Sequence, residues 1–199
     1  MLRAALDPKV YEETLFDALV DARARYGDKE ILEDQDRHPL TYTGLIRAAF
    51  VLGRKIARLT QPGERVGVLL PSSAGVVVTF FALHAFGRVP VMLNFTSGEA
   101  NLKAALKTAG VKKILSAKRF VTQAKLGPLV EEIGKHVNVV WLDDLRATIG
   151  LTDKLLGLLR RGKPRVARKP DDPAVILFTS GSEGTPKGVL LSQRNILAN

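Results

Sequence analysis

The chain has 199 residues, of which 46% are hydrophobic and 25% charged, with 30 Lys+Arg against 20 Asp+Glu and a formal net charge of +10. This globular composition excludes global disorder, and at roughly 150 residues per domain it fits one large domain or one domain plus part of another. The absence of cysteine excludes disulfides, thiolate metal sites and cysteine nucleophiles, and it fits a reducing compartment. Three widely spaced histidines, His38, His84 and His136, argue against a histidine-rich metal site.

The first half of the chain alternates between helical and strand patterns. We predict a helix at residues 14–26, two short strands at 30–32 and 40–42, and a helix at 44–59 that is capped by Thr43. A buried strand at 65–70 and a nearly all-apolar helix at 73–86 follow. The uncharged run Val66–Gly87 is long enough to span a bilayer. However, Pro71 followed by two serines favours the end of a strand and the cap of a helix, so we expect this run to belong to a soluble domain.

The second half continues the alternation. A strand, a helix and four further strands are predicted at residues 89–93, 97–110, 113–116, 137–142, 174–178 and 188–191, with helical segments between them. Strands that are apolar on both sides and separated by helices are typical of a parallel sheet covered on both faces. The predicted fold class is α/β, a doubly wound, mostly parallel sheet with helices on both faces.

Basic residues are concentrated in two stretches. Residues 103–125 contain seven basic residues and no acid, whereas residues 146–169 contain eight basic residues and one acid, Asp153. The second stretch joins a leucine-rich segment to a run of cations, namely Arg160, Arg161, Lys163, Arg165, Arg168 and Lys169. It can be a solvated linker, since glycine and prolines interrupt it, or an interfacial segment whose leucines enter lipid while its cations meet anionic headgroups. A nucleic-acid surface is disfavoured because no aromatic residues interleave with the cations.

The segment Thr179–Gly188 combines glycines, hydroxyls and one lysine directly after a buried strand. Glycines let the main chain turn sharply and bring several N–H groups to one point, which suits a phosphate, and Lys187 adds a mobile charge that can follow a departing polyphosphate. The segment is not the P-loop of kinases and GTPases, because Pro186 precedes the lysine and Gly188 follows it. A glycine-rich loop between two strands is expected, and a merely flexible hairpin is the alternative.

Several stretches resemble one enzyme family. FTSGSEGTPKG is similar to the phosphate-binding signature of adenylate-forming enzymes, namely acyl-CoA synthetases, luciferases and nonribosomal peptide adenylation domains. LTYTGLIRAAFVLGRKI and GERVGVLLPSSAGVVVTFFALHAFGRVPVMLN resemble earlier core motifs of that family in order and spacing. MLNFTSGEANLKAALKTAGVKKIL and ILFTSGSEGTPKGVLLSQRNILAN resemble the ligase half of bacterial bifunctional 2-acylglycerophosphoethanolamine acyltransferase/acyl-ACP synthetases. The resemblance extends from about Tyr11 onward.

The resemblance implies an AMP-forming acid–thiol ligase of the acyl-ACP or acyl-CoA synthetase type. ATP and a fatty acid would give an acyl-adenylate, and the thiol of acyl carrier protein or coenzyme A would then accept the acyl group. Lys187 would be the catalytic residue, and the ATP phosphates would be lined by Thr179, Ser180, Gly181, Ser182, Gly184, Thr185, Lys187 and Gly188. Glu183 departs from the usual hydroxyl, and Gln193, where many relatives have histidine, receives no role. The implied location is the cytoplasm, including the cytoplasmic face of the inner membrane.

The resemblance also implies that other parts of the catalytic machinery lie beyond residue 199. These parts are the Mg²⁺-binding glutamate, the ribose-binding aspartate and the small domain with a catalytic lysine. Residues 1–170 are expected to form the N-terminal α/β subdomain of an AMP-binding domain, and residues 171–199 the start of the next subdomain. The chain alone is then expected to be inactive. The alternative is a non-catalytic module that binds anionic lipid or nucleic acid through the basic stretches 103–125 and 146–169.

Overall fold

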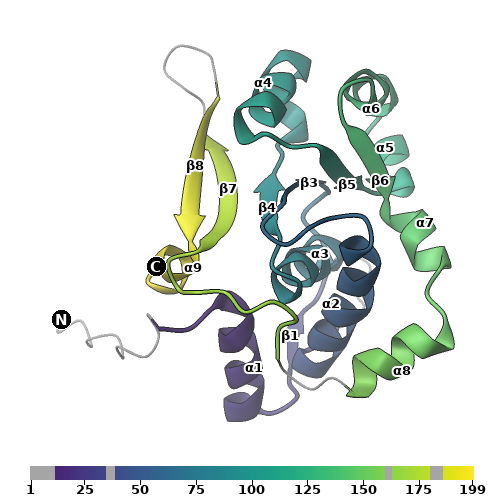
Figure 1. Cartoon of the computed structure of the whole chain (residues 1–199). Coiled ribbons are helices and arrows are strands. Elements are labelled where there is room, and N and C mark those ends of the chain that lie inside the picture. Colours follow the sequence, from purple (N-terminus) through teal and green to yellow (C-terminus); the bar gives the residue numbers. More distant parts are fainter. Residues whose placement is uncertain (1–11, 35–38, 160–162, 180–185) are drawn as a thin grey trace.

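The computed structural model describes residues 12–34, 39–159, 163–179 and 186–199. Its centre is a six-stranded sheet with the strand order β6-β5-β3-β4-β7-β8 (Figure 1). In chain order these strands are β3 (Arg65–Leu69), β4 (Val89–Met92), β5 (Lys113–Ser116), β6 (Asn138–Trp141), β7 (Pro173–Thr179) and β8 (Lys187–Ser192). Neighbouring strands from β6 to β7 run parallel, and only β8 at the edge is antiparallel. A separate antiparallel pair joins β1 (Glu30–Leu32) to β2 (Leu40–Thr41).

Helices cover both faces of this sheet, which confirms the predicted doubly wound α/β class. They are α1 (Leu15–Tyr26), α2 (Tyr42–Ala57), α3 (Ala74–Ala85), α4 (Glu99–Ala109), α5 (Lys118–Gln123), α6 (Gly127–Gly134), α7 (Leu142–Ala147), α8 (Leu151–Leu159) and α9 (Gln193–Leu197), together with the 3-10 turn η2 (Phe95–Ser97). One core lies between the sheet and α1, α2 and α3, and a second lies between the other face and α4, α5 and α6. The connection from β3 to β4 therefore crosses one face of the sheet through α3, whereas the connections from β4 to β5 and from β5 to β6 cross the other face through α4, α5 and α6.

The run Val66–Gly87 contains a strand and a helix. It includes most of β3 and all of α3, whose N-cap is Ser73. Across the described residues, every helix is too short or too polar to cross a bilayer.

Two predicted helix starts are wrong. Thr41, not Thr43, caps α2, because the Thr41 hydroxyl accepts a hydrogen bond from the Gly44 N–H at 3.1 Å. The Thr43 N–H instead donates to Asp28 Oδ1 at 2.8 Å. Ser97 ends the turn η2 rather than starting a helix, because Gly98 at φ +85° separates that turn from α4. In both places the sequence offers a short polar side chain near the start of the helix, but the helix begins at a different residue nearby.

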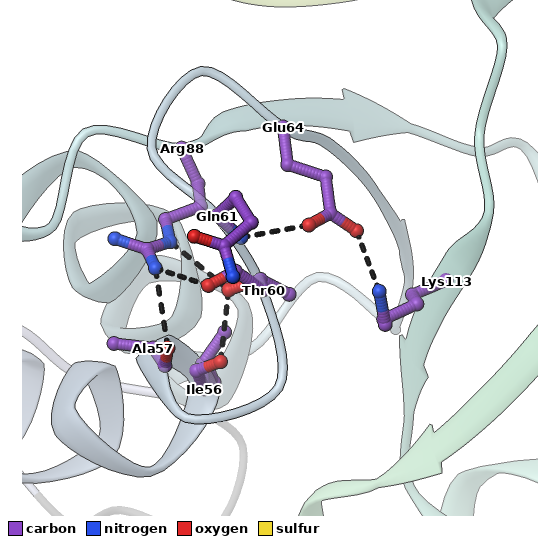
Figure 2. A network of polar contacts seen from close by, with 7 residues as sticks. All are labelled: Ile56, Ala57, Thr60, Gln61, Glu64, Arg88 and Lys113. Atoms are coloured by element: carbon purple, nitrogen blue, oxygen red, sulfur yellow. Dashed lines mark hydrogen bonds and ion pairs between the residues drawn. The ribbon is translucent and has the colours of Figure 1, made fainter.

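A buried arginine joins the end of α2 to the start of β4 (Figure 2). Arg88 is only 5% exposed, and its guanidinium donates to the Thr60 hydroxyl at 2.9 Å, to the Thr60 carbonyl at 2.5 Å and to the Ala57 carbonyl at 3.3 Å. It also donates to the Phe86 carbonyl. These acceptors include carbonyls that the end of a helix leaves without intrahelical partners, so Arg88 caps α2.

Candidate functional site

The β7–β8 hairpin carries the predicted phosphate-binding residues at the end where the chain passes from β7 to β8. The strand register places Thr179 directly opposite Lys187, and Phe178 opposite Gly188. Both Thr179 and Lys187 are exposed. The structure therefore brings three of the predicted site residues together. The others lie outside the described residues, as does Glu183; they are Ser180, Gly181, Ser182, Gly184 and Thr185.

Gly188 leaves room for the ring of Phe178 on the neighbouring strand. A Cβ atom at Gly188 would be 3.3 Å from Phe178 Cε1 and 3.7 Å from Ile176 Cγ2. The first distance is tighter than an ordinary van der Waals contact, so a side chain here would displace the ring. The glycine thus allows the Phe178 ring to lie over the β8 backbone next to Lys187.

No carboxylate in the described part of the chain forms an ion pair with Lys187. Its ammonium group extends from an exposed position on an edge strand. A lysine in this setting is a compact, mobile point charge. Together with the Thr179 hydroxyl across the strand, it forms a donor pair suited to anionic oxygens.

Gln193, to which the sequence assigned no role, fixes the base of the hairpin. It is the first residue of α9, directly after β8, and it is 1% exposed. Its Oε1 accepts a hydrogen bond from the Leu15 N–H at 3.1 Å, and its Nε2 lies 3.4 Å from His84 Nδ1 and 3.5 Å from the Pro173 carbonyl. A polar residue next to the helix cap Ser192 looks exposed in sequence, so only its non-local partners reveal its role.

His84 is held neutral at this junction. Burial, together with the positive charge of Arg168, lowers its pKa to about 3. A neutral imidazole can accept a hydrogen bond at Nδ1, which the Gln193 amide is placed to donate. The junction therefore joins α1, α3, β7 and α9 through uncharged polar groups.

A hollow of about 510 Å³ lies at the carboxyl ends of β3, β5 and β6. The chain reverses its direction across the sheet between β3 and β5, and α/β proteins usually bind ligands at such a point. Here, however, Asp34 accepts the Ala74 N–H at the start of α3, and Asp143 accepts the Lys118 N–H at the start of α5. These carboxylates already occupy the two helix starts, so the hairpin is the better anion site in the described structure.

Ion pairs neutralise much of the basic stretch 103–125. Lys103 lies 2.8 Å from Glu132, Lys113 lies 2.9 Å from Glu64, and Lys118 lies 2.5 Å from Asp144. The hydrogen bonds from Lys103 and Lys135 lower the pKa of Glu132 to about 2. The sequence concealed this pairing because the acids come from outside the stretch. The surface is therefore less cationic here than the count of lysines suggests.

Residues 19–199 match the AMP-binding enzyme family. The chain belongs to this family. It is 30% identical to sulfoacetate–CoA ligase of Cupriavidus necator over all of its own length and 38% of that protein's. It is 29% identical to medium-chain fatty-acid–CoA ligase of Escherichia coli, over 86% of its own length and 31% of that protein's. This AMP-binding chain thus spans well under half the length of these relatives.

Two solved structures share the fold of this AMP-binding chain. VinN in complex with 3-methylaspartate has a TM-score of 0.78 at 23% identity, covering 94% of this chain and 49% of that one. The N-terminal subdomain of Klebsiella oxytoca NpsA has a TM-score of 0.73 at 23% identity, covering 94% of this chain and 44% of that one.

Proposed function

We propose that this chain is the phosphate-binding part of an ATP-dependent, AMP-forming acid–thiol ligase that activates fatty acids. One observation carries the proposal: Thr179, the last residue of β7, lies directly opposite Lys187, the first residue of β8. The residues between them complete a sequence similar to the phosphate-binding signature of adenylate-forming enzymes. Membership of the AMP-binding enzyme family supports the same reading.

The described residues fit ATP by their donor chemistry. The Thr179 hydroxyl and the Lys187 ammonium offer a neutral and a charged donor, and Gly188 lets the backbone stay close to its neighbour. When bound, ATP supplies the α-phosphorus that a carboxylate attacks and the pyrophosphate that leaves. In the proposal, Thr179 orients the β- and γ-phosphates and Lys187 neutralises the charge that develops on them. The residues proposed to line the phosphates with them are those predicted from sequence, Ser180, Gly181, Ser182, Gly184, Thr185 and Gly188. Ligands for Mg²⁺ are proposed to lie beyond residue 199.

The substrate and acceptor are proposed on two grounds. The segments 92–115 and 176–199 resemble the ligase half of acyl-ACP synthetases, and one relative bears the name of a medium-chain fatty-acid–CoA ligase. We accordingly propose a fatty acid as substrate and the thiol of acyl carrier protein or coenzyme A as acceptor. The proposed location is the cytoplasm. Residues 1–170 and 171–199 are proposed as successive subdomains, although β7 and β8 continue the same sheet as β3–β6.

The proposal is tested by isotope exchange between pyrophosphate and ATP, using the longest natural protein that contains this chain. Exchange should depend on an added fatty acid and should not occur with sulfoacetate or aspartate in its place. Fatty-acid-independent exchange, or exchange driven only by a small polar carboxylate, would refute the proposed substrate class. No exchange with any carboxylate would refute the ligase assignment itself.

A further inference from the structure

Helix α8 packs with its acidic residue inward and two of its leucines, Leu151 and Leu155, outward. Asp153 is 5% exposed and faces α2 together with the buried Gly157. Leu151 is 84% exposed and Leu155 is 56% exposed, one turn apart, with the exposed Lys154 beside them. A surface helix of a globular protein normally shows the reverse arrangement.

Specific contacts hold α8 in this orientation. Asp153 Oδ2 lies 2.7 Å from the Nζ of the buried Lys55, and Asp153 Oδ1 lies 3.5 Å from Arg54 Nε. The same Lys55 ammonium donates to the Thr148 carbonyl at 2.7 Å, just before the helix. A Cβ atom at Gly157 would lie 2.8 Å from Val51 Cγ2, so only glycine allows this close approach. Rotating α8 to bury its leucines would break the ion pair and separate this contact.

Basic residues are frequent in and around α8. Lys154 is exposed beside Leu155, whereas Arg54 and Arg165 border a hollow of about 360 Å³ on the inner side of the helix, beside Asp153 and Gly157. Lys163 and Arg165 are exposed on the segment that follows the helix. Between residues 145 and 170 the only acid in the sequence is Asp153, and α2 contains none. With the one acid buried against Lys55, the outward surface combines apolar and positively charged side chains.

We propose that the α8 face, defined as Leu151, Lys154 and Leu155 together with the exposed Lys163 and Arg165 of the segment that follows the helix, docks onto an anionic lipid bilayer. Protruding leucines can enter the boundary between headgroups and acyl chains, while neighbouring cations meet the headgroup charges. A bilayer is favoured over an acidic protein because the leucines project from one short helix. A fluid interface accommodates such a projection without a matching groove. The proposal goes beyond the ligase activity and does not depend on it.

The test is co-sedimentation of the 199-residue chain with vesicles of phosphatidylglycerol and phosphatidylcholine, or of phosphatidylcholine alone. The chain should bind the anionic vesicles, bind neutral vesicles weakly, and lose affinity as salt is raised. The double variant Leu151→Ser/Leu155→Ser should reduce the partition coefficient about tenfold, because each leucine contributes apolar area to the interface. Lys154→Glu should reduce binding in the same direction.

Two matched variants serve as controls. Tyr26→Ser removes a 52% exposed aromatic residue from α1, and Lys107→Glu reverses an exposed charge on α4, and both should bind like wild type. Thermal melting of each variant checks that it folds. Absence of binding to anionic vesicles would overturn the proposal, as would equal losses in the controls. Binding that depends on charge but is unchanged by the leucine substitutions would point to an acidic macromolecule and would also overturn it.

Discussion

Lys187 lies opposite Thr179 at the end of the hairpin where the chain passes from β7 to β8, and no carboxylate among the described residues forms an ion pair with it. In a complete ligase containing this chain, we predict that Lys187→Ala slows acyl-adenylate formation more than it weakens ATP binding. Negative charge grows on pyrophosphate as its bond to the α-phosphorus breaks, so the contact strengthens in the transition state. Losing it should cost about 3 kcal/mol, or about a hundredfold in rate. Single-turnover measurements at saturating ATP give this rate.

The control is Lys112→Ala, an exposed lysine that precedes β5, which is separated from the β7–β8 hairpin by β3 and β4. It should leave both rate and affinity unchanged. If Lys187 is instead a ground-state anchor, the ATP dissociation constant of Lys187→Ala will rise while the single-turnover rate stays within about twofold of wild type.

Arg88 illustrates a residue whose importance lies in backbone acceptors rather than in a carboxylate partner. We predict that Arg88→Met lowers the free energy of unfolding by about 3 kcal/mol, because it leaves several buried carbonyls unsatisfied near the end of α2. Urea denaturation measures the change. Arg58→Met, on the same helix end but exposed, should change stability by less than about 0.5 kcal/mol. Equal effects of the two substitutions would show that the Arg88 network contributes nothing specific.

Sequence reasoning at the residue scale succeeded where the determinants are local. Thr14 caps α1 through a hydrogen bond within three residues, and the helix predicted at residues 14–26 starts at this position. Gln193 was missed because its partner, the Leu15 N–H, is 178 positions away. Lys55 was missed for the same reason, since its partner Asp153 belongs to a distant helix. Pairing between distant residues leaves no pattern in a single sequence.

At the scale of elements, α8 is held to α2 by the ion pairs of Asp153 with Lys55 and Arg54 and by the close approach of Gly157 to Val51. We predict that Asp153→Asn loosens α8 without unfolding the sheet, so that backbone amides of residues 151–159 exchange faster while those of β3 do not. The asparagine retains the shape but loses the charge that faces Lys55 and Arg54. Hydrogen exchange read by mass spectrometry gives both values. Asp144→Asn, which alters an exposed ion pair with Lys118, should leave exchange in α8 unchanged.

The same ion pair predicts how the attachment of α8 depends on pH. The hydrogen bond from Lys55 lowers the pKa of Asp153 below its usual value of 3.8, and the hydrogen bond from the Gly150 N–H adds to this. A carboxyl group whose pKa is lowered on folding stabilises the fold above its usual pKa and loses that effect as pH falls through the lowered value. Helix α8 should therefore stay attached from neutral pH down to about pH 4 and loosen in stronger acid. Loosening between pH 7 and 5 would contradict this assignment.

Strand prediction worked because the parallel strands are short apolar runs with turn residues at their ends, and all six sheet strands were located within two residues of their bounds. The orientation of α8 could not be predicted. Its leucines and its single acid suggested a linker or an amphipathic segment, and only the partners on α2 determine which side faces inward.

At the scale of the whole molecule, the fold class follows from the alternation of helices and strands, whereas the strand order does not. Nothing in one sequence places β7 beside β4 rather than beside β6, because that choice depends on how complete faces pack. The candidate site follows the same division. The signature in the sequence predicts the chemistry of the site, whereas the strand register shows which of its residues lie opposite each other.

The 199-residue chain alone should release no pyrophosphate from ATP and a long-chain fatty acid. The resemblance to adenylate-forming enzymes assigns the Mg²⁺ and ribose contacts to later segments, and the chain spans 38% of the length of one relative. A coupled phosphate assay with inorganic pyrophosphatase detects the product, and the longer natural protein is the positive control. Turnover by the chain alone would mean that the catalytic groups are wrongly assigned.

The hydrogen bond between Leu15 and Gln193 has a consequence for how the protein is made. During synthesis α1 emerges from the ribosome long before its acceptor Gln193 has been translated. Helix α1 can therefore complete its polar contacts only after nearly the whole sheet has been produced, although it precedes all the other described helices in the chain. A helix that is synthesised before the sheet is then among the last elements to be held in place. In a chain ending at residue 192, the Leu15 amide should exchange rapidly while the amides of β3 remain protected.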